Sequence, residues 1–212
     1  MALGTFEKQM AILAHRWKPV SLLDLVSWIE GKMSLPRRAV VVTFDDGTED
    51  NFTHAFPILS KYRIPATIFL SPGSITFNTL KLDQIIQMHD NGITFGSHTY
   101  SHRYLPSLSL EQVHQELRKS KEWLEKLIRP IEFLSYPAGG FTSEIVTIAR
   151  KVGYRAACTT NRGLKRHPIN PWALRRLTMH NRATSSFGMF IRCSGYYGIN
   201  RRIRHSHQDD GI

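Results

Sequence analysis

One apolar, strand-like run in this chain ends in two adjacent acids. Val40-Val41-Val42-Thr43-Phe44 is followed directly by Asp45, Asp46 and Gly47. β-Branched and aromatic residues favour a buried strand. Two carboxylates at the end of such a strand are costly, because like charges repel and burial desolvates both groups. The motif therefore predicts a site where a cation or a proton transfer uses the pair.

A second cluster lies further along, in the segment Ser97-His98-Thr99-Tyr100-Ser101-His102. Two histidines four residues apart can face the same way on a helical turn, and on a loop they could also converge. One carboxylate and two imidazoles suit Zn²⁺ and similar divalent ions, with positions left open for water. Either Asp45 or Asp46 could be the third ligand, and the other acid is then a candidate base.

Each motif also has a simpler interpretation when it is taken alone. A pair of histidines at this spacing is common on a polar surface, and Asp-Asp-Gly is typical of an exposed turn. Both motifs follow predicted strand ends in the same chain, and this shared placement favours the metal site.

Strand-like and helix-like segments alternate along the chain. We expect strands at 39–44, 66–70, 94–97, 133–135, 156–159 and 174–178. We expect helices at 6–17, 22–30, 50–61, 79–90, 110–128, 143–152 and 185–197, with Pro57 either kinking the third helix or marking its start. This alternation predicts a parallel sheet with crossover connections. In a β/α barrel the carboxyl ends of the strands carry the active site.

The bulk composition is that of an ordinary globular domain. The 212 residues are 42% hydrophobic and 21% charged, which suits one domain with a sizeable core. We expect that domain to span residues 1–204, followed by a disordered polar tail at 205–212. No apolar run is long enough to span a membrane, and the first residues lack a signal-peptide pattern. We therefore expect cytoplasmic or membrane-peripheral residence, unless the sequence is a piece of a longer exported protein.

The net charge of +11 allows peripheral contact with an anionic membrane or an acidic polymer. A nucleic-acid binder would interleave aromatic and basic residues on one surface. No such run is visible, so we expect no nucleic-acid partner. Cys158 and Cys193 are too far apart in sequence to indicate a zinc motif or a disulfide framework.

The segments Thr43–Gly47 and Ser97–His102 together resemble the polysaccharide deacetylase family, also called the NodB homology domain or carbohydrate esterase family 4. The resemblance extends through Pro65–Phe69 and Ser135–Gly139 and covers residues 6–197. It implies an α/β fold, a distorted (β/α) barrel of the NodB type whose first strand could be missing here. It also implies metal-dependent hydrolysis of N-acetyl or O-acetyl groups on a polysaccharide or a lipid-linked oligosaccharide.

By position in these motifs, the resemblance implies Asp45 as the catalytic base and Asp46, His98 and His102 as the metal ligands. The ion would be Zn²⁺, with Co²⁺, Ni²⁺ or Mn²⁺ as alternatives. It would polarise the acetyl carbonyl and hold the attacking water. The partner would be an N-acetylated glycan substrate. The oligomeric state is left open.

The third motif, Ser135-Tyr136-Pro137-Ala138-Gly139, is similar to the branch of the family with a Tyr-Pro pair. The resemblance implies that Tyr136 and Pro137 contact the substrate. The N–H of Ala138 would hold the oxyanion, because Pro137 has no N–H. Ser135 stands where many members carry an arginine that orients the base, and Ala138 stands where they carry an aromatic residue.

Two roles have no direct match in these motifs. Arg175 or Arg176, near a predicted strand, is the natural substitute for the orienting arginine. The acid that protonates the leaving group would be His180, with His167 as a weaker alternative. The departures leave open a second hypothesis, a weakly active or inactive glycan-binding domain that retains the metal site. Asp45 argues against it, because a structural metal site needs only the other three residues.

Overall fold

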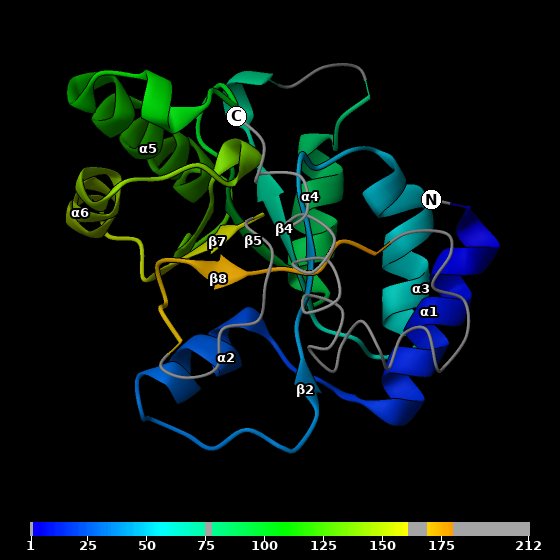
Figure 1. Ribbon diagram of the computed structural model, residues 1–212. Helices are drawn as coiled ribbons and strands as arrows, with labels where there is room; N and C mark the ends of the chain where they lie inside the picture. The colour runs from blue at the N-terminus through cyan, green and yellow to red at the C-terminus, as the bar shows by residue number, and fades with distance from the viewer. Residues whose placement is uncertain (1, 75–77, 161–168, 180–212) are drawn as a thin grey trace, which may run out of the picture.

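A computed structural model describes residues 2–74, 78–160 and 169–179, and its centre is one parallel sheet (Figure 1). The sheet is six-stranded and its strands follow one another in chain order. They are β3 (Val42–Phe44), β4 (Ala66–Leu70), β5 (Thr94–Ser97), β6 (Phe133–Ser135), β7 (Ala156–Thr159) and β8 (Leu174–Arg175). This order is that of a barrel wall, in which each crossover leads to the neighbouring strand. β3 and β8 are the two edges of the curled sheet.

The strand expected at 39–44 is divided between two sheets. β2 (Ala39–Val40) pairs in parallel with β1 (Lys18–Pro19), whereas β3 pairs with β4. The run is continuous in sequence, but its two halves have different pairing partners. The expectation was therefore right about extended backbone and wrong about one unbroken strand. The last expected strand, at 174–178, is only two residues long as β8.

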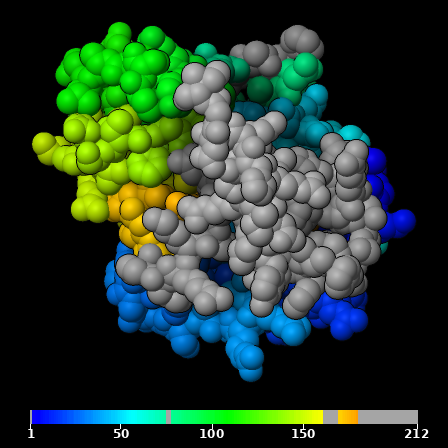
Figure 2. Space-filling view, in the orientation of Figure 1, coloured from blue at the N-terminus to red at the C-terminus, as the bar shows by residue number. Residues whose placement is uncertain are grey.

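Six α-helices lie around the described sheet (Figure 1). They are α1 (Leu3–Arg16), α2 (Leu22–Ile29), α3 (Phe56–Lys61), α4 (Leu82–Asp90), α5 (Leu110–Glu125) and α6 (Ser143–Val152). A π-helical turn, Asn51–Ala55, precedes α3, and Pro57 falls in the first turn of α3, where a proline costs least. α4 starts later than expected because Thr79 pairs with Thr48 in an isolated bridge. α5 and α6 together form one side of the molecule (Figure 2).

Local sequence signals explain where several helices begin and end. The hydroxyls of Ser21 and Ser109 accept the N–H of Asp24 and Gln112, so both serines cap their helices. Gly153 ends α6 with a φ of +95°, a left-handed conformation that glycine adopts without steric cost.

Within the described part of the chain, the core has two parts that lie on opposite faces of the sheet. The larger part packs α1 and α3–α6 against the outer face of the strands. The smaller part fills the inside of the curled sheet and comprises Leu22, Val26, Phe69, Phe133, Ala156, Cys158 and Leu174. The first two of these residues belong to α2, which lies below the sheet in Figure 1, and the cluster they join includes the first residues of β6, β7 and β8. α2 therefore closes the amino end of the barrel, and the carboxyl ends of the strands lie on the other side.

No helix among the described residues is both long and apolar enough to cross a bilayer. The helix expected at 185–197, the tail at 205–212 and Cys193 lie outside the described residues.

Candidate active site

Four strands bring the candidate residues together at the carboxyl end of the sheet. Asp45 and Asp46 follow β3, and His98 follows β5. Ser135 is the last residue of β6, and Arg176 follows β8. Parallel strands end at the same edge of a sheet, so these side chains meet although they are up to 131 positions apart in sequence.

Asp46, His98 and His102 form a possible metal-binding group. Their ligand atoms all lie within 4.8 Å of one another. The Asp46 Oδ1 atom is 3.7 Å from His98 Nε2 and 3.3 Å from His102 Nε2. The two histidines are joined by a loop rather than a helical turn, and their ring centroids are 4.7 Å apart. Of the two acids, Asp46 is therefore the one that approaches both imidazoles.

The His98 ring is buried, and its orientation is set by a hydrogen bond on the far side. His98 Nδ1 lies 2.7 Å from the carbonyl oxygen of Ser135. A carbonyl can only accept, so Nδ1 carries the proton and Nε2 is left with a lone pair facing Asp46. Burial lowers the pKa of His98, against the attraction of Asp45, and so favours the neutral imidazole that metals bind.

The backbone at this group is held in unusual conformations. Asp46, Thr99 and His102 have φ values of 70°, 65° and 57°. Left-handed backbone costs a residue with a side chain about 1–3 kcal/mol and concentrates at binding and catalytic sites. Two of these residues are members of the group and the third lies between its histidines. The donor set, its spacing and this backbone fit a divalent cation bound by three protein ligands.

Asp45 lies beside this group, where its charge acts on His98, and it pairs with Arg176. Arg176 Nη1 donates to Asp45 Oδ1 at 2.8 Å, and Nη2 donates to Oδ2 at 2.7 Å. Ser135 Oγ donates to Asp45 Oδ1 at 3.1 Å and accepts from Arg176 Nη2 at 2.9 Å. Arg176 also reaches Thr43 Oγ1, at 3.3 Å. The carboxylate is therefore fixed by a planar two-point contact and by one hydroxyl.

These contacts also set the charge state of Asp45. Burial alone would raise the pKa of this carboxyl, but the hydrogen bonds and positive charge of Arg176 outweigh it and hold the pKa below its ordinary value. The side chain is still 26% exposed. Asp45 is therefore an ionised carboxylate that substrate and water can approach.

The third motif forms a tight turn beside the site. Pro137–Gly139 is a 3-10 helix in which Ala138 has a φ of 52°. The first N–H groups of a helix have no acceptor within that helix. The N–H of Ala138 belongs to this class of donors and could donate to an oxyanion. Pro137 is buried, and the Tyr136 side chain is fully buried and stacks on Phe141. A contribution of Tyr136 to substrate binding would therefore have to come from its backbone.

The candidates for the remaining roles are placed differently. Arg176 is the arginine that reaches Asp45, and its neighbour Arg175 has an exposed side chain. His180 and His167 lie outside the described residues.

Sequence reasoning missed the direct contact of Ser135 with Asp45. It treated this serine as the place of a missing arginine, whereas the Ser135 hydroxyl bridges Asp45 and Arg176. The available signal was a polar residue at the end of an otherwise apolar strand.

With this geometry in view, sequence comparison gives a clear result. The sequence profile described as "Polysaccharide deacetylase" matches residues 32–157, which is more than half of the 212-residue chain. The chain belongs to the polysaccharide deacetylase family. The matched residues include the Asp-Asp-Gly motif, both histidines and the third motif, so the family signal and the geometric site coincide.

Curated proteins that are named as deacetylases are similar to this chain. YxkH of Bacillus subtilis, provisionally named a polysaccharide deacetylase, is 34% identical over 157 residues, or 73% of this chain and 56% of the relative. The poly-beta-1,6-N-acetyl-D-glucosamine N-deacetylase of Staphylococcus epidermidis is 31% identical over 172 residues, or 73% and 59%. The matches thus span somewhat more than half the length of these curated relatives.

A similar solved structure supports the fold. The Streptococcus pyogenes deacetylase PplD, in complex with acetate, superposes with a TM-score of 0.84 at 24% sequence identity. The match covers 90% of this chain and 86% of the other. The expected NodB-type barrel is therefore confirmed as the fold.

Proposed function

We propose that this chain is a metal-dependent hydrolase that removes acetyl groups from an N-acetylated polysaccharide. The observation that carries the proposal is the pairing of two features at one end of the barrel. Asp46, His98 and His102 form a three-ligand metal group, and the adjacent Asp45 is held ionised by Arg176 rather than used as a fourth ligand. A purely structural metal site would have no use for that second carboxylate.

The proposed cofactor is a divalent cation, with Zn²⁺ first and Co²⁺, Ni²⁺ or Mn²⁺ as alternatives. When bound, it supplies Lewis acidity toward the acetyl carbonyl and favours deprotonation of water. Asp46, His98 and His102 would hold it.

Asp45 has the properties of a general base. It is ionised, partly exposed and fixed in orientation by Arg176 and Ser135. In the proposed reaction one Asp45 oxygen accepts a proton from the attacking water, and the contacts with Arg176 keep that oxygen aimed at the reacting atoms. Arg176 and Ser135 act through Asp45 and are positioning residues.

The N–H of Ala138 is the proposed donor to the oxyanion that forms at the acetyl carbon. Ala138 has a left-handed backbone within a short turn. The next N–H, that of Gly139, is bonded to the Tyr136 carbonyl, and this bond helps to fix the turn that carries the Ala138 N–H. Protonation of the departing nitrogen needs a separate acid, and His180 remains the prediction for that role.

We propose β-1,6-linked N-acetylglucosamine oligomers as the first substrates to test, because the Staphylococcus epidermidis relative is named for that polymer. The measurement is acetate release from these oligomers and from β-1,4-linked ones, after chelation and after addition of each metal. Release that requires metal supports the proposal. If the protein binds metal but releases no acetate from any acetylated glycan, the proposal is wrong, and binding of the same glycans would then support the alternative of an inactive glycan-binding domain.

A further inference from the structure

The loop between the two histidines is anchored unequally at its two ends. His98 is buried and hydrogen-bonded through its ring to β6. His102 has a side chain that is 44% exposed and a backbone with φ 57°. The His102 side chain contacts Asp46 and the His98 ring, which are members of the same group. The position of His102 therefore depends on what holds the loop itself.

Helix α5 contacts this loop directly through Glu116 and, one turn away, indirectly through Ser97 at the end of β5. Ser120 and Ser97 share a hydrogen bond of 2.8 Å between their hydroxyls, and Ser97 Oγ accepts the N–H of Thr99 at 3.1 Å. Glu116, four residues earlier on the same face of α5, accepts from Ser101 through both carboxylate oxygens. The Ser101 N–H lies 2.8 Å from Oε2, and the Ser101 hydroxyl lies 2.5 Å from Oε1.

We propose that Glu116 is a positioning residue for the metal group. It holds Ser101, and through Ser101 the left-handed backbone of His102, in the conformation that brings His102 Nε2 to Asp46. The inference rests on the proposed function in one respect, because it requires that Asp46, His98 and His102 bind a metal ion.

Two physical reasons favour a carboxylate at this position. Ser101 offers two donors side by side, and a carboxylate can accept both at once. Left-handed backbone is unfavourable at a histidine and persists only where its surroundings hold it. Without Glu116 the Ser101 end of the loop can relax to ordinary backbone, and His102 then leaves the group. The metal would have to restore that order from its own binding free energy, so its affinity falls.

The test is the metal affinity of Glu116→Ala, measured by competition with a chromophoric chelator. Residues that orient metal ligands typically change affinity by about 10–100-fold, and we expect a loss of at least about tenfold here. Glu116→Gln keeps an acceptor for the Ser101 N–H, so it should retain most of the affinity. Acetate release by Glu116→Ala should recover when excess metal is added, because the defect lies in ligand order and not in Asp45.

Glu122→Ala is the matched control, since Glu122 is an exposed acid on α5 that pairs with Arg118. It should bind metal as the parent protein does. If Glu116→Ala lowers the melting temperature but binds metal as tightly as the parent, Glu116 only braces the fold and the inference is wrong. It is also wrong if the parent protein binds no metal. If the parent binds metal but releases no acetate, the proposed function fails, while the affinity comparison still decides the role of Glu116.

Discussion

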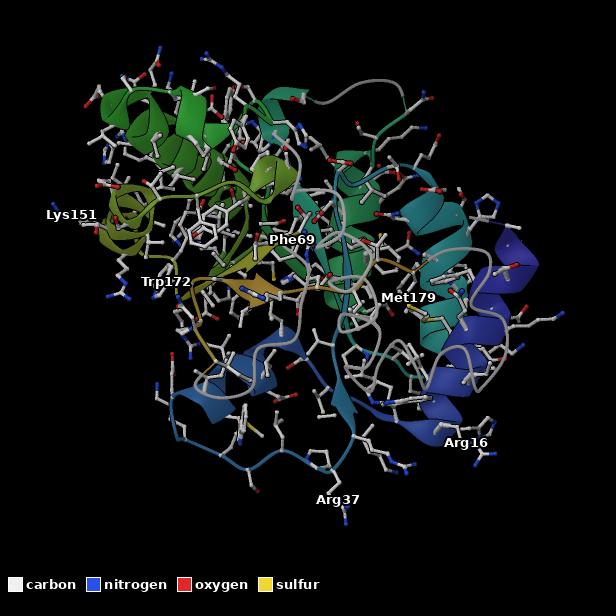
Figure 3. The ribbon with its side chains drawn as sticks, viewed as in Figure 1. Arg16, Arg37, Phe69, Lys151, Trp172 and Met179 are labelled. Atoms are coloured by element: carbon white, nitrogen blue, oxygen red, sulfur yellow. The ribbon has the colours of Figure 1, made fainter. Side chains whose placement is uncertain are left out.

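Arg176 lies between the two edge strands of the sheet, β3 and β8. It follows β8, and its partners Asp45 and Thr43 belong to the end of β3. The Arg176 side chain is 17% exposed. Its guanidinium lies over the Phe69 ring, 5.8 Å from the ring centroid, and Figure 3 labels Phe69 near the middle of the fold. A single side chain thus orients the proposed base and packs on the barrel interior.

Replacing Arg176 should slow catalysis more than it weakens substrate binding. Arg176→Gln removes the two-point contact, and a misplaced base can cost on the order of 100-fold in kcat. Arg176→Lys keeps the charge but lacks the planar fork, so we expect an intermediate rate. KM and metal affinity should change little, and steady-state kinetics with a metal titration would check this. Arg37→Gln, in an exposed turn, is a control for loss of positive charge. A rate unchanged in Arg176→Gln would contradict the positioning role.

The residue-level site could be predicted only in part. Adjacent positions on a strand point to opposite faces, so the choice between Arg175 and Arg176 depends on the register in which β8 pairs with β7. The Asp46, His98 and His102 group was easier to foresee, because its members are contained in two short motifs.

At the scale of elements, α5 connects the candidate site to the wall of the barrel. Its residues Glu116 and Ser120 contact the histidine loop and the preceding Ser97 at the end of β5. Near its end, α5 contacts the segment that leads into β6, where Lys121 donates to the Ile131 carbonyl and Glu125 accepts the Ile131 N–H. Lys121 and Glu125 also form an ion pair of 2.9 Å. Displacement of α5 would therefore move both the loop and β6.

The Glu125 network predicts a pH-dependent part of the stability. Burial alone would raise the pKa of Glu125, but its hydrogen bond with Lys121 outweighs this and lowers the pKa. A lowered folded-state pKa stabilises the fold above the ordinary carboxyl range, and this stabilisation is lost as the pH falls through the folded pKa. Glu125→Gln should therefore lower the free energy of unfolding by about 1 kcal/mol at pH 7.

The measurement is urea unfolding of both proteins, with a chelator present, at neutral pH and near pH 3. The difference between parent and variant should shrink at the acid pH. An equal difference at both pH values would show that the ionised form of Glu125 contributes nothing.

Most helices and strands could be predicted where local sequence signals mark their ends. β4, β5, β6 and β7 match the expected ranges because short apolar runs end at polar or turn residues. The errors arise where tertiary pairing decides: the run at 39–44 divides between two partners, and Thr79 joins Thr48 instead of starting α4. Local propensity carries no information about either partner.

At the scale of the whole molecule, the candidate site lies where the barrel is held together by side chains. β3 and β8 are the edges of the six-stranded sheet, and the contacts of Arg176 with Asp45 and Thr43 join those edges. α2 closes the opposite end with Leu22 and Val26. The open edge of the barrel and the proposed catalytic centre are therefore the same place.

Metal binding should stabilise the whole fold. A ligand that binds only the native state at 100 times its Kd adds about 2.7 kcal/mol to the free energy of unfolding. For a chain of this size that corresponds to a rise in Tm of roughly 5–10 °C. Thermal unfolding with Zn²⁺ and with a chelator measures the effect. His102→Ala should lose the shift, and a shift of the same size in that variant would place the bound metal elsewhere.

The most direct test of the account separates metal binding from chemistry in one variant. Asp45→Asn keeps the shape of the side chain but removes the proposed base, while Asp46, His98 and His102 are untouched. We predict that it binds Zn²⁺ as tightly as the parent protein and releases acetate from N-acetylglucosamine oligomers about 10²–10⁴-fold more slowly. Acetate release at the parental rate by metal-loaded Asp45→Asn would contradict the account.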